Sequence, residues 1–221
     1  MTRKNVPDDQ YGQLCRRLGE VARRVDEGSI PFDATMRSLQ LIVERGNIAV
    51  SAPASKYREQ DGVIYFSVAS DGTTGPQWIK HLEKKGFRIG DYTKSVLRSD
   101  DFKPTNGVTT EIAVLKGDLF EDNDRVTKKI RAEADRRNLA KPNAEVACFI
   151  REKFTDGEIE AMGLWWIVAM HEPIEDSDGD LRLLGADRHD YGRWLNAWDD
   201  EPGYRWRRGS GFAFAVAQVG P

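Results

Sequence analysis

The sequence predicts an α+β protein: an αα-hairpin at the N-terminus, then a mixed or mainly antiparallel sheet covered by helices, with a β-rich C-terminal region. Three observations lead to this prediction. Apolar residues recur at helical spacing in the first 46 positions. Short β-branched and aromatic runs, bounded by turn residues, alternate with helical stretches in the centre. Residues 164–221 hold five of the six Trp.

Length and charge set limits on function. The chain has 221 residues, enough to bury a sizeable core in one domain with an appendage. Its 33 basic and 36 acidic residues leave a net charge of −3, so no global field marks a dedicated binder of polyanions or polycations. Cys15 and Cys148 lie far apart and belong to no CxxC pair, which argues against a disulfide framework.

The sequence contains no signal for export or membrane insertion. No apolar run reaches the roughly 18 residues that a membrane span needs. The first twelve residues lack the apolar stretch and cleavage site of a secretory signal. We therefore expect a cytoplasmic protein with no membrane partner.

Two amphipathic helices joined by a short turn are predicted within residues 1–46. Their apolar positions are Leu14, Leu18, Val21, Val25, Met36, Leu39, Ile42 and Val43. One helix pair cannot bury both apolar stripes well, so we expect the hairpin to pack on the main domain or to dock on a partner protein. A DNA-reading helix-turn-helix is the alternative, but the sequence shows no third helix.

The remainder is predicted to be a linker over residues 47–61 and an α+β domain over 62–221. The linker mixes Ala, Ser, Pro and charged residues. The predicted strands of the domain are 63–69, 108–116, 164–170 and 212–219, and its predicted helices are 76–85, 91–98, 122–138 and 144–154. In the last strand Phe212 and Phe214 point to one face and Ala213 to the other.

A basic segment over residues 125–141 is the first candidate surface. It holds seven basic and two acidic residues, a local net charge of +5. The candidate contacts for nucleic-acid phosphates are Arg125, Lys128, Lys129 and Arg131. A solvated helix face with partly paired charges is the alternative interpretation.

A loop that interleaves aromatic and guanidinium groups is the second candidate surface. Its candidate nucleic-acid or nucleotide contacts are Arg205, Trp206, Arg207 and Arg208. Stacking faces beside arginines suit nucleotides and single-stranded nucleic acid. The alternative is a self-neutralised loop, because residues 199–201 read DDE and stand directly before it.

An acidic turn is a candidate site for Ca²⁺ or Mg²⁺. Residues 175–180 read EDSDGD, which imitates the opening of an EF-hand-type loop, although Leu181 stands where that loop needs Gly. The candidate metal ligands are Asp176, Asp178, Asp180 and Asp187. His171 and Glu172 would join these carboxylates in a metal-dependent hydrolase or nuclease, and His189 and Asp190 would extend the cluster. An ordinary hairpin turn is the alternative.

Several stretches resemble segments of bacterial proteins of unknown function. They are GPQWIKHLEKKGFRIGDYTKSVLRS, GVTTEIAVLKGDLF and GLWWIVAMHEPIEDSDGDLRLLGADR, and the resemblance covers roughly residues 70–221. The segment DEGSIPFDATMRSLQLIVE resembles a helical-hairpin module at the front of otherwise different chains. The resemblance implies two separable units and assigns no residue a role.

Three functions follow from these features. The leading hypothesis is a non-catalytic intracellular binding or regulatory protein, with nucleic acid or a nucleotide as its ligand. The second is the metal-dependent hydrolase or nuclease that uses His171, Glu172 and the acidic turn. The third is a protein-interaction module that docks through residues 1–46.

Overall fold

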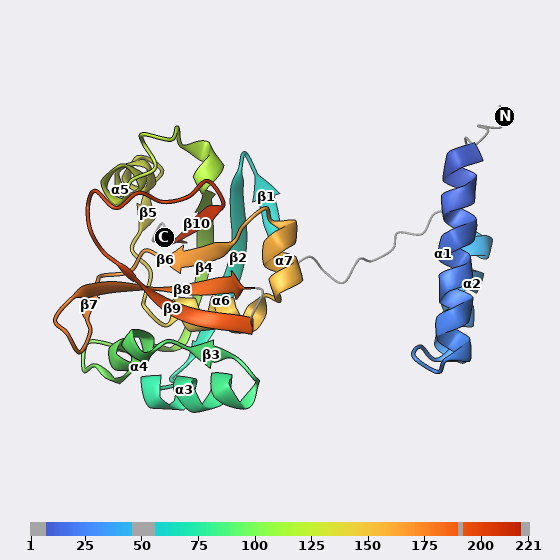
Figure 1. Ribbon diagram of the computed structural model, residues 1–221, viewed down its shortest axis with the longest axis horizontal. Coiled ribbons are helices and arrows are strands. Elements are labelled where there is room, and N and C mark those ends of the chain that lie inside the picture. The colour runs from blue at the N-terminus through green and yellow to red at the C-terminus, as the bar shows by residue number, and fades with distance from the viewer. Residues whose placement is uncertain (1–7, 46–55, 190–191, 218–221) are drawn as a thin grey trace. The chain divides into compact units, whose positions relative to one another are not determined.

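The computed structural model describes residues 8–45, 56–189 and 192–217, and it confirms the predicted α+β fold (Figure 1). The chain divides into two compact units, residues 1–54 and residues 55–221. In the part of the chain that is described, no helix is both long enough and apolar enough to cross a bilayer.

The first unit is a helical hairpin. Helix α1 spans Asp8–Asp26 and α2 spans Phe32–Arg45, with Gly28 at a φ of 68° in the turn between them. The apolar stripes face a shallow groove between the helices, yet no residue from 11 to 40 is buried. The expected docking of this hairpin on the main domain or on a partner protein stays a prediction.

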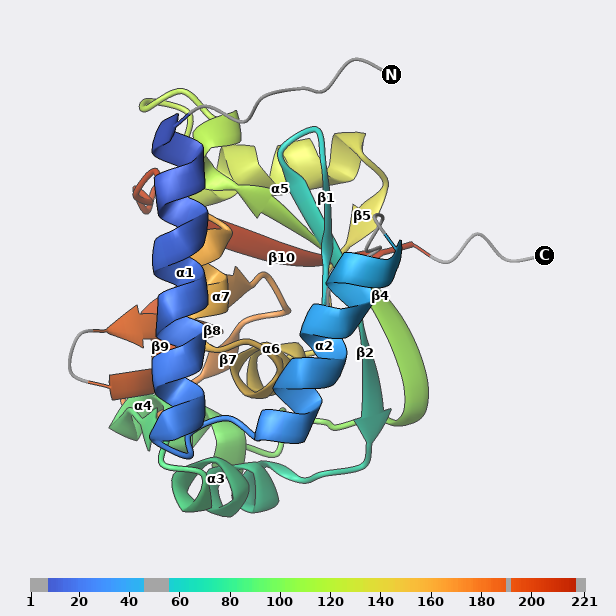
Figure 2. The same ribbon diagram turned by 90° about the vertical axis from the view of Figure 1, so that its right-hand side faces the viewer.

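The second unit is built on one mixed sheet of ten strands (Figure 2), in the order β1-β2-β4-β10-β6-β8-β9-β3, which can be followed by the labels in Figure 1. β5 pairs with β10, and β7 pairs with β8. The β10–β6 and β3–β9 pairs are parallel, and the other pairs are antiparallel. The bounds are β1 Arg58–Gln60, β2 Val63–Asp71, β3 Arg88–Ile89, β4 Asn106–Lys116, β5 Leu139–Ala140, β6 Trp166–Ala169, β7 Ile174–Glu175, β8 Leu181–His189, β9 Gly192–Asp199 and β10 Ser210–Val216.

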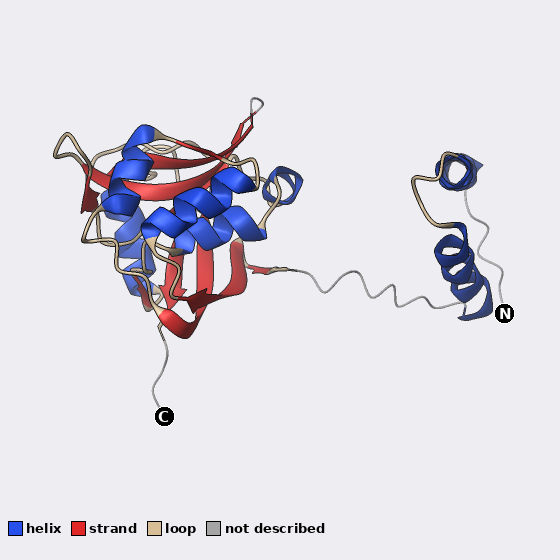
Figure 3. Cartoon of the chain, turned by 90° about the horizontal axis from the view of Figure 1, so that it is seen from below, coloured by secondary structure: helices blue, strands red, loops and turns tan. Residues whose placement is uncertain are grey.

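Helices pack on the sheet and bury its two faces in separate apolar clusters (Figure 3). Helices α3 (Gly75–Lys84), α4 (Asp91–Arg98), α6 (Val146–Lys153) and α7 (Asp156–Ala161) bury one face. Helix α5 (Thr127–Arg136) lies on the other face. Phe120, before this helix, and Tyr204 and Trp206, in the loop before β10, pack in the same apolar cluster. The predicted alternation of the last strand is confirmed, because Phe212 and Phe214 join the α5 side and Ala213 joins the α6 side.

Several predicted boundaries differ from the structure for identifiable reasons. The predicted linker 47–61 includes β1, which pairs with β2 across a turn at Asp61 and Gly62, both at positive φ. The rest of that linker up to residue 55, and the end of the predicted strand 212–219, fall outside the described residues. Helix α5 begins at Thr127 rather than at residue 122, because the preceding turn folds around the buried Arg125.

The sequence prediction also missed helix α7 and several strands, among them β8 and β9. Thr155, which was expected to end a helix, is instead the N-cap of α7, in a capping box with Glu158. The strands β8 and β9 were not predicted individually, although the region was expected to be rich in β structure. These two strands matter most, because they form one wall of the candidate site described below.

A fully buried arginine joins the helical layer to the sheet. Arg151, on α6, donates to the backbone carbonyls of Asp187 (2.7 Å) and Phe154 (2.8 Å). It also donates to the carboxylate of Asp156 at 2.8 Å. A buried charge is costly unless its donors are satisfied, so these three acceptors fix where α6, α7 and β8 meet.

We expect Arg151→Met to lower the free energy of unfolding by about 3 kcal/mol, because the three oxygens lose a buried donor. Urea denaturation followed by circular dichroism measures this loss. Arg136→Met is the matched control: Arg136 pairs with Glu133 but its side chain is 77% exposed, so its loss should stay below about 1 kcal/mol. Equal losses in the two variants would contradict the role given to Arg151.

Candidate functional site

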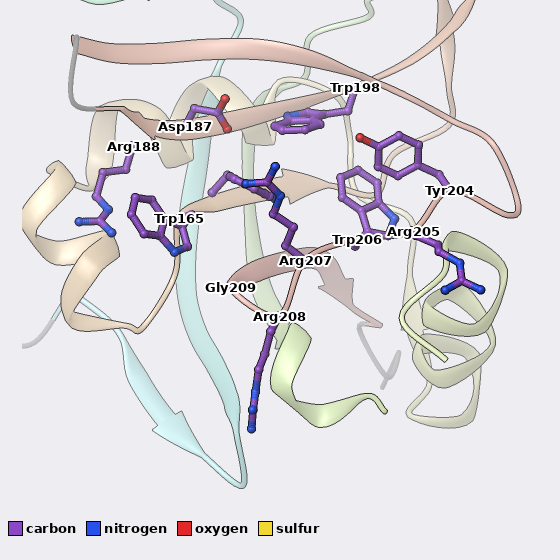
Figure 4. Close-up of a pocket in the computed structure, with 11 residues that line it drawn as sticks. Trp165, Asp187, Arg188, Trp198, Tyr204, Arg205, Trp206, Arg207, Arg208 and Gly209 are labelled. Atoms are coloured by element: carbon purple, nitrogen blue, oxygen red, sulfur yellow. The ribbon is translucent and has the colours of Figure 1, made fainter. Parts of the chain in front are cut away.

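A pocket of about 640 Å³ opens beside α5, on the same face of the sheet as that helix (Figure 4). Its sheet wall comes from β6, β8 and β9, and its other wall is the loop that leads into β10. Five aromatic residues line it, and we call it the aromatic pocket: Trp165, Trp166, Trp198, Tyr204 and Trp206. This volume lies within the usual range for small-molecule sites.

Four of the five aromatic rings form a contiguous chain of contacts. The ring centroids of Trp166 and Trp198 are 5.0 Å apart with a tilt of 33°. Trp198 lies 5.7 Å from Trp206, which lies 4.7 Å from Tyr204. Trp206 is only 4% exposed, whereas Trp165 is 50% exposed. The cluster therefore has one buried anchor and stackable rings around it.

Two indole donors in this cluster have no acceptor. The Nε1–H groups of Trp166 and Trp198 are buried, and neither has a hydrogen-bond partner among the residues that the structure describes. Buried donors without a partner are uncommon in folded proteins. Both nitrogens are also shut off from solvent, and that of Trp198 lies over Gly185 of β8, so they belong to the packed base of the pocket rather than to its open surface.

The loop that carries the arginines is anchored on the start of α5. The backbone N–H of Trp206 donates to the carbonyl of Arg125 at 3.0 Å, and its indole Nε1 donates to Thr127 Oγ1 at 3.1 Å. The backbone N–H of Thr127 donates to the carbonyl of Tyr204 at 3.3 Å. The structure thus places the basic segment that begins at residue 125 next to the loop that carries Arg205, Arg207 and Arg208.

Gly117 lets the same loop lie close to the end of β4. A Cβ at this position would come within 2.6 Å of the carbonyl oxygen of Arg208 and 2.9 Å of that of Arg207. Both are backbone atoms, so they cannot rotate away as a side chain would. The glycine is therefore required for the observed path of the loop.

The three arginines of the loop point in different directions (Figure 4). Arg207 points into the aromatic pocket, with its guanidinium 5.8 Å from the ring centroid of Trp166. Arg205 and Arg208 point away from the pocket. All three are exposed, and none forms an ion pair with another described residue.

The predicted self-neutralisation of this loop is not what the structure shows. Asp199 pairs with Arg182, on the neighbouring strand. Asp200 pairs with Arg131 of α5 at 2.8 Å. Asp199 and Asp200 are therefore engaged elsewhere, and the third acidic residue before the loop, Glu201, is exposed and forms no ion pair with a described residue.

The predicted basic surface at residues 125–131 is largely neutralised. Arg125 is buried and donates to the carbonyls of Gly117 (2.7 Å) and Phe120 (2.8 Å) and to Asp122 (2.9 Å). Lys129 pairs with Asp124, and Arg131 pairs with Asp200. Of the four predicted phosphate contacts, Lys128 alone is exposed without an ion pair to a described residue.

The acidic turn forms an internal hydrogen-bonded unit. Asp176 accepts from the backbone N–H groups of Asp178 (2.8 Å) and Asp180 (3.2 Å) and from Arg182 Nε (2.5 Å). Burial by itself would raise the pKa of Asp176, but these hydrogen bonds hold it below its usual value. Asp187 lies at the far end of β8, about 20 Å along the strand.

The structure therefore does not bring the four predicted metal ligands together. Among the residues it describes, no group of three or more His, Cys, Asp or Glu side chains is placed to hold a metal ion. Asp187 instead lines the aromatic pocket and accepts from Asn196 Nδ2 at 2.6 Å. Asp190, and the side chain of His189, lie outside what the structure describes.

His171 is held by the backbone on both sides of its ring. Its Nδ1 lies 2.6 Å from the carbonyl oxygen of Glu172, and its Nε2 accepts from the backbone N–H of Leu184 at 2.9 Å. The side chain is 1% exposed. Both nitrogens are thus occupied in joining the segment after β6 to β8, which is a structural use rather than a catalytic one.

Sequence reasoning found the arginines of the site but not its wall. Arg205, Trp206, Arg207 and Arg208 all line the pocket, as a group predicted from the loop alone. Trp165, Trp166 and Trp198 were not predicted as site residues. The concentration of Trp in the last quarter of the chain was the available signal.

Comparisons of the chain with protein-family models, with curated proteins and with solved structures give no significant match.

The burial of His171 predicts a pH dependence of stability. Burial lowers its pKa from 6.5 to about 4. Below pH 6.5 the unfolded chain takes up a proton that the folded chain does not, so the stabilisation is complete above pH 6.5 and declines as the pH falls towards 4. The expected loss is on the order of 3 kcal/mol.

The measurement compares the unfolding free energy of the wild type and of His171→Gln from pH 7 to pH 4.5. Carboxylates contribute to both curves, so the difference between the curves isolates His171. The wild type should lose more stability than the variant over this range. Parallel curves would show that His171 does not behave as the structure indicates.

Proposed function

We propose that this chain is a binding protein whose aromatic pocket holds a nucleotide unit, with the base against the tryptophans and the phosphate at Arg207. The observation that carries the proposal is the presence, in one pocket, of stackable indole rings and an exposed guanidinium without an ion pair to any described residue. Neither feature alone indicates a ligand. Together they match the two halves of a nucleotide.

The rings suit a planar aromatic ligand. Bases stack on aromatic side chains with about 1–3 kcal/mol per base. Trp166 and Trp198 are partly exposed and adjoin each other, and Trp165 presents a half-exposed ring at the rim.

The charges favour an anion over a cation. Aromatic clusters also bind quaternary ammonium groups, but these cations need neighbouring side chains that are neutral or negatively charged. Here Arg207 points into the pocket without an ion pair to a described residue, whereas Arg188, at the rim beside Trp165, pairs with Glu160. The one carboxylate in the lining, that of Asp187, accepts from Asn196 Nδ2. A guanidinium donates to phosphate through a planar fork. A phosphorylated ligand therefore fits the pocket better than a cationic one.

Isothermal titration calorimetry tests the proposal with four nucleoside monophosphates, the matching nucleosides and inorganic phosphate. We expect each nucleotide to bind more tightly than its nucleoside or phosphate alone, because stacking and the Arg207 contact act together. Arg207→Gln should bring the affinity for the nucleotide down to that for the nucleoside. No heat of binding for any nucleotide at millimolar concentration, and none for a short oligonucleotide, would refute the proposal.

A pair of tryptophan variants tests whether the ligand binds in the aromatic pocket. Trp198→Leu should weaken nucleotide binding about tenfold, since one stacking contact contributes about 1–3 kcal/mol. Trp194→Leu is the matched control, because Trp194 lies on the same strand but outside the pocket, beside Arg88. The control should leave the affinity unchanged. An equal effect of the two substitutions would exclude the pocket as the binding site.

A further inference from the structure

Two of the three loop arginines border the pocket but direct their side chains away from it. Arg207 points in, whereas Arg205 and Arg208 point away from it (Figure 4). Both outward arginines are exposed and lack an ion pair with any described residue. A single nucleotide in the pocket would leave them unused.

A fourth exposed cation lies on the side of Arg205. The backbone N–H of Lys128 donates to the carbonyl of Pro202 at 3.0 Å, and Arg205 forms a β-bridge with Val126. Lys128 and Arg205 therefore stand near each other where the loop crosses the start of α5. Like the loop arginines, Lys128 has no ion pair to a described residue.

Three neighbouring carboxylates are paired with other cations, while the exposed Glu201 has no ion pair to a described residue. Asp199 and Asp200 pair with Arg182 and Arg131, and Asp124 pairs with Lys129. The cations that stay exposed thus continue from the pocket mouth in two directions, towards Lys128 and Arg205 on one side and past Arg208 on the other.

We infer that the ligand is a single strand of nucleic acid several nucleotides long, with one base in the aromatic pocket and flanking phosphates at Arg205 and Arg208. This inference rests on the proposed function and narrows it from a nucleotide unit to a polymer. A single strand fits because its bases can leave the stack, whereas the bases of a duplex are covered on both faces. The contacts are to phosphates and to one stacked base, so both RNA and DNA are suitable probes.

The test is a fluorescence-anisotropy titration with labelled DNA and RNA strands of about ten nucleotides, within the span of known single-strand sites. Three phosphate contacts predict a slope of log affinity against log salt near −2. Binding should therefore weaken about 20-fold between 50 and 200 mM salt, against about 3-fold for a mononucleotide held by Arg207 alone. A duplex of the same length should bind more weakly than either strand.

The decisive variant is Arg205→Gln with Arg208→Gln. It should reduce the salt dependence for strands to nearly that of a mononucleotide, and leave the mononucleotide affinity unchanged. The matched control is Lys80→Gln with Lys84→Gln, which removes two exposed charges from α3, on the opposite face of the sheet. The control should change neither measurement.

The outcomes separate this inference from the proposed function. Mononucleotide binding with no gain for strands, or strands that bind the arginine double variant as tightly as the wild type, would overturn the inference and leave the proposed function standing. Absence of binding by mononucleotides and strands alike would overturn both. A stronger preference for the duplex would show that the arginines serve a different mode of contact.

Discussion

The arrangement of the candidate site depends on one buried guanidinium, that of Arg125. Its donors hold the carbonyls of Gly117 and Phe120 and the carboxylate of Asp122, so the turn before α5 is closed around it. Its own carbonyl accepts from the backbone N–H of Trp206. A charge removed from water must keep its partners, which makes this turn costly to open. The loop with the pocket arginines is attached to that rigid turn.

The distribution of ion pairs decides where the surface stays positive. The net charge of −3 is an average over segments of opposite sign. Most cations of the basic segment are matched within a few residues or across to the loop, as Arg131 is by Asp200. The pocket mouth is different because its three loop arginines, Arg205, Arg207 and Arg208, have no ion pair within the described chain. Local pairing, rather than total charge, therefore selects the surface that suits an anion.

The sequence predicted well the features that depend on neighbours in the chain. The periodicity of β2, β4 and α3 and the two-faced alternation of β10 are local patterns, and the structure follows them closely. The burial of Arg125 was not predictable, because its acceptors include carbonyls of residues 117 and 120 that only the folded turn presents. Likewise Trp166 and Trp198 meet only because β6 and β9 flank β8, a register that no local pattern encodes. The loop arginines could be predicted because Arg205, Arg207 and Arg208 stand next to Tyr204 and Trp206 in the sequence itself.

The position of β10 has a consequence for the order in which the second unit forms. This strand lies between β4 and β6 in the middle of the sheet, although it follows every other strand along the chain. During synthesis the edges of β4 and β6 therefore lack their partner until residue 216 has left the ribosome exit tunnel. Contacts between distant parts of a chain are slow to form, and unpaired strand edges favour association with other chains. The pocket cannot form before then either, because one of its walls is the loop that leads into β10.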